Sequence, residues 1–162
     1  MQHPDGFEIP GTGGLPVHWT TAWTNFGQGE AHMYDSNGED SFEGRITLRL
    51  HVGPSGGAEF VLSDPIPVSP KTDYFLQARM RYNLVGGADS VYYTVIQFDS
   101  GGNELGLNET RGIAGDDFWT WQPKRLLLHT TPNAAFIRIR FGLIAASESY
   151  LDVDAVGGRD WS

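Results

Sequence analysis

Glycine and proline interrupt this chain so often that it has little room for long helices. Its 162 residues include 21 glycines and nine prolines, and the longest stretch free of both is the 15 residues from Lys71 to Val85. In a helix interior, glycine and proline are less favourable than alanine by about 1 and about 3 kcal/mol. Because 40% of the residues are hydrophobic and 12% aromatic, the chain can still fold around a core. We therefore expect a β-rich globular protein.

Between these breakers, apolar and polar residues alternate with the period of a β-strand. In 45–52, Ile46, Leu48 and Leu50 share one face. The stretch 71–85 alternates in the same way, although its residue types also permit a helix. Alternation or β-favouring composition marks five more segments, 58–62, 90–99, 124–130, 136–141 and 149–156. Shorter candidates lie near Phe7, at 18–23 and at 30–34.

Turn sequences separate the expected strands. Residues 99–103 (Asp-Ser-Gly-Gly-Asn) are typical of a hairpin turn, and 53–57, 64–67 and 85–87 are further breaks. Many short strands with frequent turns indicate an all-β sandwich or jelly roll. No internal repeat or linker is evident, so we expect one domain over residues 1–162.

The charge pattern limits the partners of such a domain. The chain has 11 basic against 20 acidic side chains, a formal net charge of −9, which argues against nucleic acid and anionic membranes as main partners. No apolar run approaches the roughly 20 residues of a membrane-spanning helix. Most arginines fall in expected strands and most acids in turns, so we expect the sheet faces to be locally basic. The absence of cysteine excludes disulfides, thiol nucleophiles and cysteine metal sites.

Short motifs that resemble catalytic or metal sites lack the required context. Residues 53–57 match the G-x-S-x-G nucleophile elbow, but a strand is expected after them where that motif needs a helix. Residues 35–40 begin like a calcium loop, but an EF-hand needs glycine and glutamate where the chain has Asp40 and Ile46. The acids in expected strands form no evident catalytic pair. We therefore expect no enzymatic activity, with a small jelly-roll hydrolase or lyase as an open alternative.

Eight segments, in order along the chain, resemble the carbohydrate-binding modules of families four, nine and twenty-two, part of the galactose-binding-like jelly-roll group. These segments are 6–8 (Gly-Phe-Glu), 14–19, 43–48, 66–74, 98–102, 118–121, 131–135 and 150–156. The resemblance covers nearly the whole chain. It implies an all-β jelly-roll β-sandwich of two antiparallel sheets, one of them concave.

The resemblance also implies a non-catalytic module that binds a glycan on the concave sheet. Aromatic side chains would stack on sugar rings, while arginine and glutamine would hydrogen-bond the hydroxyl groups. The candidate ligand-binding residues are Trp19, Trp23, Arg79, Arg81, Tyr93, Gln97, Arg138 and Arg140. Arginine binds carboxylates in a bidentate manner, so an acidic glycan or an acidic protein surface would fit an arginine-rich sheet. Alternatively, these arginines balance the acids of the chain itself.

Such modules often contain a structural calcium ion, for which hard oxygen ligands are suited. Glu8 and Asp154 match the places of the family's ligands, and the loop that includes Glu43 is expected to contribute further oxygen ligands. The family often has paired aspartates where this chain has Asp154 followed by Ala155.

A second interpretation is a structural protein of a virus particle, such as a phage capsid decoration or tail protein, because one fold can serve several functions. Residues 1–10 begin with methionine and lack the regions of a signal peptide, which favours a free-standing domain. The jelly roll would then serve protein–protein assembly, with a homo-oligomer expected. The two interpretations predict an extracellular location or the virion surface.

Overall fold

The computed structural model describes residues 7–25, 29–35, 41–42 and 46–161, without the side chains of 23–25 and 159–161. Eleven strands and no helix are present in these ranges. The strands are β1 (Trp19–Asn25), β2 (Gly29–Asp35), β3 (Ile46–Val52), β4 (Gly57–Ser63), β5 (Ile66–Pro67), β6 (Asp73–Tyr82), β7 (Ser90–Phe98), β8 (Glu104–Ile113), β9 (Gln122–His129), β10 (Phe136–Ala145) and β11 (Ser149–Trp161). Within the same ranges, no helix is long and apolar enough to cross a membrane.

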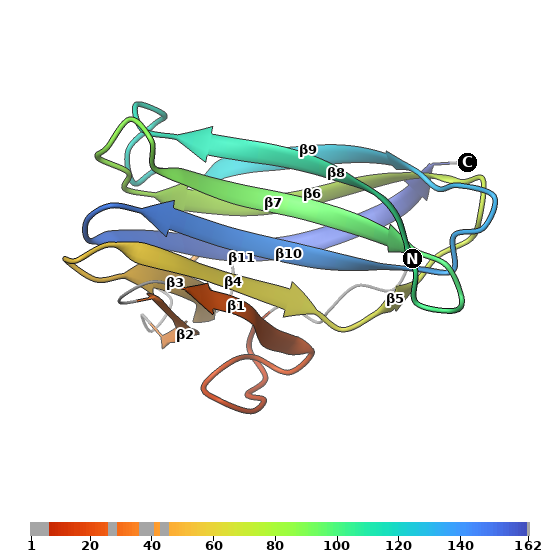
Figure 1. Cartoon of the computed structure of the whole chain (residues 1–162), viewed down its shortest axis with the longest axis horizontal. Coiled ribbons are helices and arrows are strands. Elements are labelled where there is room, and N and C mark those ends of the chain that lie inside the picture. Colours follow the sequence, from red (N-terminus) through yellow and green to blue (C-terminus); the bar gives the residue numbers. More distant parts are fainter. Residues whose placement is uncertain (1–6, 26–28, 36–40, 43–45, 162) are drawn as a thin grey trace.

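The strands form two antiparallel sheets that pack face to face. The front sheet has the order β1-β4-β10-β7-β8, and β5 pairs with β10 at its side. The back sheet has the order β2-β3-β11-β6-β9. Figure 1 shows the front sheet in the nearer layer and the back sheet behind it. The predicted fold, an all-β jelly-roll sandwich of two antiparallel sheets, is confirmed.

The core lies between the sheets and follows the alternation seen in the sequence. Leu48 and Leu50 of β3 and Leu76 of β6 are fully buried. Their partly exposed neighbours face outward, namely Arg49 on β3 and both Phe75 and Gln77 on β6. A row of aromatic rings crosses the same layer, because the ring centroid of Phe141 lies 5.6 Å from that of Trp19 and 5.0 Å from that of Tyr93. Burying side chains of this size supplies about 1.5–3 kcal/mol each.

Of the two turns at 53–57 and 99–103 that were interpreted as hairpin loops, the second is a hairpin and the first is not, because the strands beside 53–57 belong to different sheets. Residues 53–56 join β3 of the back sheet to β4 of the front sheet, with Gly56 at a φ of 80°. The G-x-S-x-G sequence is therefore a turn between the two sheets, followed by a strand, and neither a hairpin loop nor a nucleophile elbow. Residues 99–103 join β7 to β8. There the Asp99 carboxylate accepts hydrogen bonds from the backbone N–H groups of Asn103 and Gly101, both at 2.9 Å. These bonds, those to Asn103 first, lower the pKa of Asp99.

Three elements differ from the sequence expectation. Strand β8 was not predicted, because Gly106 and Gly112 dilute its pattern and most of its residues are at least partly exposed. The short β5 lies where a break was expected. Phe7 is buried in the core at 1% exposure, yet it belongs to a turn rather than a strand.

Candidate ligand-binding face

The four arginines expected on one sheet lie on opposite sides of the sandwich. Arg79 and Arg81 belong to β6 in the back sheet, whereas Arg138 and Arg140 belong to β10 in the front sheet. All four point away from the core, as the alternation predicted. The prediction that one sheet face combines all four arginines is therefore wrong, because strand pairing places β6 and β10 in different sheets.

Three other candidate residues face the core. Trp19, Tyr93 and Gln97 are 2%, 0% and 5% exposed, so their predicted place on a binding face is wrong. In β7, Tyr93 alternates inward with Val91 and Val95, and burial raises its pKa. The Gln97 amide instead donates to the carbonyl of His129 and accepts from the N–H of Thr131. These bonds satisfy a buried amide inside the fold.

Trp23 pairs with Phe60 in the β1–β4 register. Its side chain lies outside the described part of the structure, so its predicted role in ligand binding stays a prediction.

The outward-facing residues of β4, β10, β7 and β8, which we call the front face, are arranged in rows. The strand register sets residues of neighbouring strands side by side, and successive rows are about 7 Å apart. From the Gly142 end of β10, the rows are Phe60–Gly142–Tyr92–Arg111, Leu62–Arg140–Thr94–Glu109, Arg138–Ile96–Leu107 and Phe136–Phe98–Glu104. The strands that carry these rows are neighbours in Figure 1.

The first row contains an aromatic pair. Gly142 has no side chain, and the Phe60 ring lies over it, so that a Cβ at position 142 would be 2.2 Å from Phe60 Cε2. The centroids of Phe60 and Tyr92 are 5.9 Å apart with 31° between the ring planes. The Arg111 guanidinium lies 4.9 Å from the Tyr92 centroid. Tyr92 is half-buried and Phe60 buried, so Tyr92 presents the more accessible ring.

The second row ends in a carboxylate that already has partners. Glu109 Oε2 accepts a hydrogen bond from the Thr94 hydroxyl at 2.7 Å, and Oε1 accepts one from Arg111 Nε at 3.1 Å. Arg140 Nη2 lies 3.9 Å from Oε2, which is longer than a hydrogen bond. Among the described residues, the buried Nε of Arg140 has no hydrogen-bond partner. Arg140 therefore retains unused donors beside an aromatic platform.

The third and fourth rows place a second arginine beside a second aromatic pair. Arg138 Nε donates to the Ser63 carbonyl at 2.9 Å. In the next row, the rings of Phe136 and Phe98 stack at a centroid distance of 5.0 Å and an angle of 11°. The two arginines of β10 thus lie between two aromatic pairs. Such a face offers rings for stacking and charged donors for hydrogen bonds.

The back sheet carries arginines that are already paired. Asp152 of β11 lies between Arg49 of β3 and Arg81 of β6 in the register. Its Oδ1 accepts from Arg49 Nε at 2.7 Å, and its Oδ2 accepts from Arg81 Nη2 at 2.8 Å. Arg49 stacks 3.6 Å from the Tyr34 ring centroid, and Arg81 stacks 4.3 Å from that of Trp119. Because these charges are compensated inside the cluster, we interpret it as structural.

The neighbouring Arg79 is placed differently from Arg81. Its Cζ lies 4.6 Å from the Phe42 ring centroid, and among the described residues its buried Nε has no hydrogen-bond partner. Phe42 donates its backbone N–H to the carboxylate of Asp154 at 3.0 Å. The segment at 41–42 thus lies over this part of the back sheet.

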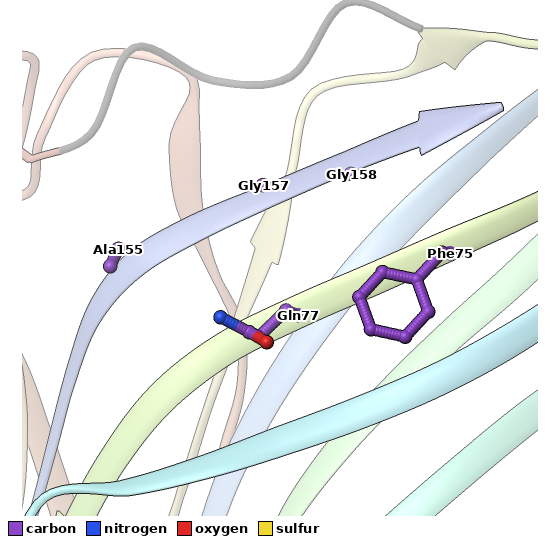
Figure 2. Close-up of a pocket in the computed structure, with 5 residues that line it drawn as sticks. All are labelled: Phe75, Gln77, Ala155, Gly157 and Gly158. Atoms are coloured by element: carbon purple, nitrogen blue, oxygen red, sulfur yellow. The ribbon is translucent and has the colours of Figure 1, made fainter.

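A small open pocket of about 260 Å³ lies on the back sheet, where β11 bulges between Asp154 and Gly157. It is lined by Phe75, Gln77, Ala155, Gly157 and Gly158. Figure 2 shows Phe75 and Gln77 projecting from β6 beside the glycines of β11. Its volume is below the roughly 300–1,000 Å³ of small-molecule sites, and the Gln77 side chain already accepts from Arg125.

The described residues do not assemble the predicted calcium site. Glu8 accepts from the N–H of Ile46 at 2.9 Å, while Asp154 accepts from the N–H groups of Phe42 and Ala155. Across the described ranges, no group of three or more histidines, aspartates or glutamates could hold a metal ion. Glu43 lies outside these ranges. Calcium binding therefore stays a prediction.

Sequence reasoning missed most residues of the front face, among them Phe60, Tyr92, Thr94, Glu109 and Arg111. The adjacent tyrosines of β7 showed that one of them must face outward, but not which one. Glu109 and Arg111 had no predicted face because β8 itself was not predicted.

Comparisons with known proteins connect this sandwich to carbohydrate-binding modules by fold. No family model matches the sequence, and no curated protein is significantly similar to it. The enzymatically active domain of tailspike protein 4 from bacteriophage CBA120 has a TM-score of 0.72 at 15% identity, over 90% of this chain and 20% of that chain. A structure described for the promiscuous specificity of carbohydrate-binding modules of the β-sandwich superfamily has a TM-score of 0.66 at 15% identity, over 94% of this chain.

A family 61 module in complex with β-1,4-galactotriose has a TM-score of 0.62 at 10% identity, over 90% of both chains. A xylan-binding domain of family 22, one of the families that the sequence resembles, shares the fold at a TM-score of 0.53. The chain spans only a fifth of the tailspike chain and 61% of the β-sandwich superfamily chain. At these identities, the comparisons establish a jelly-roll fold of the carbohydrate-binding-module type.

Proposed function

We propose that this domain is a non-catalytic carbohydrate-binding module whose glycan lies across the front face. The proposal rests on the composition of the first two rows. There the half-exposed ring of Tyr92 lies beside two guanidinium groups and the carboxylate of Glu109. Tyr92 would stack on the apolar face of a sugar ring. Arg111 and Arg140 would donate to hydroxyl oxygens, and Glu109 would accept from a hydroxyl group.

The acid content of the front face supports binding without catalysis. Glycoside hydrolysis in most families needs two carboxyl groups about 5–9.5 Å apart on either side of the bond. Among the residues of the four rows, Glu109 and Glu104 are the carboxylates, and they lie two rows, about 14 Å, apart. Thr94 and Arg111 already engage Glu109. The fold similarity to modules studied with sugar ligands, including the galactotriose complex, supports the same reading.

Affinity electrophoresis in gels that contain soluble polysaccharides tests this proposal. The panel includes xylan, β-glucan, galactan, pectin and hyaluronan, and calorimetry with oligosaccharides follows any retardation. We expect Tyr92→Ala to weaken binding about tenfold or more, which corresponds to about 1.4 kcal/mol. The matched control is Phe118→Ala, which removes a 65% exposed aromatic ring outside the front face. Absence of glycan binding by the wild-type domain would remove the proposal, and equal weakening by both variants would remove the assignment to Tyr92.

The tailspike similarity favours a second candidate, a structural domain of a virus particle. In that case, the front face would contact an acidic protein surface rather than a glycan, and the domain would form a symmetric homo-oligomer. Light scattering after gel filtration separates the candidates, because an oligomer that buries Tyr92 would dissociate in Tyr92→Ala. Both candidates place the domain outside the cell, either secreted or on a virion surface.

A further inference from the structure

We propose that the glycan of the front face carries a carboxylate group and that Arg138 and Arg140 bind this group together. The inference rests on the proposed function of the face and adds the ligand class, a uronic or sialic acid sugar rather than a neutral one. It rests on three observations: the unused N–H donors of the two guanidinium groups, the few acidic side chains around them, and the aromatic pairs on either side.

Both guanidinium groups have donors to spare. Arginine has five N–H donors, and Arg138 uses its Nε on the carbonyl of Ser63. The buried Nε of Arg140 has no hydrogen-bond partner within the described structure. The side chain of Arg140 is 32% exposed, so a ligand can reach its outer nitrogen atoms.

The acid next to these arginines forms a long ion pair with Arg140 and, among the described residues, no hydrogen bond with either of them. Glu109 uses Oε2 for Thr94 and Oε1 for Arg111, and it stays 3.9 Å from Arg140. The β7 neighbours of Arg138 and Arg140 in the register are the uncharged Ile96 and Thr94. The first three rows therefore contain three arginines against one glutamate, although the whole chain has a net charge of −9.

The back sheet shows what a compensated pair looks like in the same protein. There, Arg49 and Arg81 bond a shared aspartate at 2.7–3.0 Å. Arg138 and Arg140 have no such acid at hydrogen-bond distance among the described residues. A carboxylate supplied by a ligand would complete an equivalent arrangement, with charge-assisted N–H···O bonds that are about twice as strong as neutral ones.

The aromatic pairs fit an oligosaccharide with the acidic sugar in the middle. Arg138 and Arg140 are two residues apart on β10, so their Cα atoms are about 7 Å apart. The Phe60–Tyr92 pair lies one row beyond Arg140, and the Phe98–Phe136 pair lies one row beyond Arg138. Sugars on either side of the carboxylated one would thus each have a ring to contact.

The test compares two ligands that differ in charge and share one sugar backbone. Calorimetry measures binding of trigalacturonic acid and of its methyl ester, and in parallel of sialyllactose and lactose. We expect at least one acid to bind about tenfold or more tightly than its neutral counterpart. The preference should shrink between about 0.05 M and about 0.5 M NaCl, because salt screens charge pairing at an accessible site.

Variants assign the preference to the two arginines. The double variant R138Q/R140Q should bind acid and neutral ligand equally, whereas Arg140→Lys should keep only part of the preference, because lysine lacks the bidentate geometry. The matched control is Arg125→Gln, which removes one arginine from the back sheet and should leave the preference unchanged. Circular dichroism melting confirms that each variant is folded.

Each result separates the two proposals. If neutral glycans bind as tightly as acidic ones, and if Tyr92→Ala abolishes this binding, the carbohydrate-binding function stands and the carboxylate preference is overturned. Binding of no saccharide would overturn both. An acid preference that survives in R138Q/R140Q would overturn the role of these arginines. Binding of a short polyglutamate peptide in place of every saccharide would overturn the glycan ligand in favour of an acidic protein surface.

Discussion

The buried charge cluster of the back sheet gives a stability prediction that can be worked from its geometry. Asp152 is fully buried and accepts four hydrogen bonds from Arg49 and Arg81, at 2.7, 3.0, 3.0 and 2.8 Å. The Arg81 side chain is 6% exposed and that of Arg49 is 14% exposed. Replacing Asp152 with alanine would leave two nearly buried positive charges without their acid.

The expected cost of Asp152→Ala is about 3–5 kcal/mol, the range for removing one partner of a buried ion pair. At about 2–4 °C per kcal/mol for a domain of this size, the melting temperature should fall by roughly 6–20 °C. The matched control is Asp64→Ala. It breaks the His18–Asp64 pair, whose side chains are 46% and 53% exposed, and should cost less than about 1 kcal/mol.

Urea unfolding at pH 7, monitored by tryptophan fluorescence and circular dichroism, measures both variants. A loss for Asp152→Ala as small as that for Asp64→Ala would refute the reasoning that the cluster is closed and solvent-excluded. The triple variant R49M/R81M/D152L should recover most of the lost stability, because well-packed apolar side chains can replace a buried ion cluster. Glycan binding by the folded Asp152→Asn protein should match the wild type, because the proposed ligand lies on the opposite sheet.

Three further predictions concern the front face, an acid-sensitive contact and calcium. Gly142→Val should destabilise the domain by about 1–3 kcal/mol and weaken glycan binding, because its side chain would collide with the Phe60 ring, and urea unfolding with calorimetry measures both effects. The hydrogen bond from the Tyr82 hydroxyl lowers the pKa of Asp116. The stabilisation that this hydrogen bond contributes is therefore present above the ordinary aspartate pKa and lost as the pH falls through the lower pKa of the folded state. Urea unfolding of the wild type and Asp116→Asn at a series of acidic pH values measures this loss. An equal dependence of the unfolding free energy on pH in both proteins would contradict it. If a structural calcium ion is bound, chelator should lower the melting temperature, whereas an unchanged melting curve would contradict the calcium prediction.

Local sequence patterns predicted most of the strands because burial on one side imposes a period of two. This rule worked where one face is fully apolar, as in β3 with Leu48 and Leu50. It failed for β8, an edge strand whose residues are mostly exposed or half-buried and whose alternation is interrupted by two glycines. A two-residue strand such as β5 carries too few residues for any period to be visible.

The candidate site was harder to predict, because a face depends on information that lies outside each strand. Alternation predicted that Arg79 and Arg81 share a face and that Arg138 and Arg140 share a face, and both groupings hold. Whether the two groups meet depends on which strands pair, and β6 pairs with β11 while β10 pairs with β4 and β7. Within β7, a run of β-favouring residues gives no polar phase, so nothing local distinguished Tyr92 from Tyr93.

The same dependence on pairing decides what the arginines do. From the sequence, two explanations competed: the arginines bind a ligand, or they balance the acids of the chain. For Arg81 the structure supports the second, because Asp152 lies opposite it in the register and bonds it directly. For Arg138 and Arg140 the directly paired residues are uncharged, and Glu109, one strand further, lies 3.9 Å from Arg140, so compensation within the chain explains these arginines only in part. A net charge of −9 therefore coexists with a positively charged sheet face, and that face is where an acidic ligand would gain most.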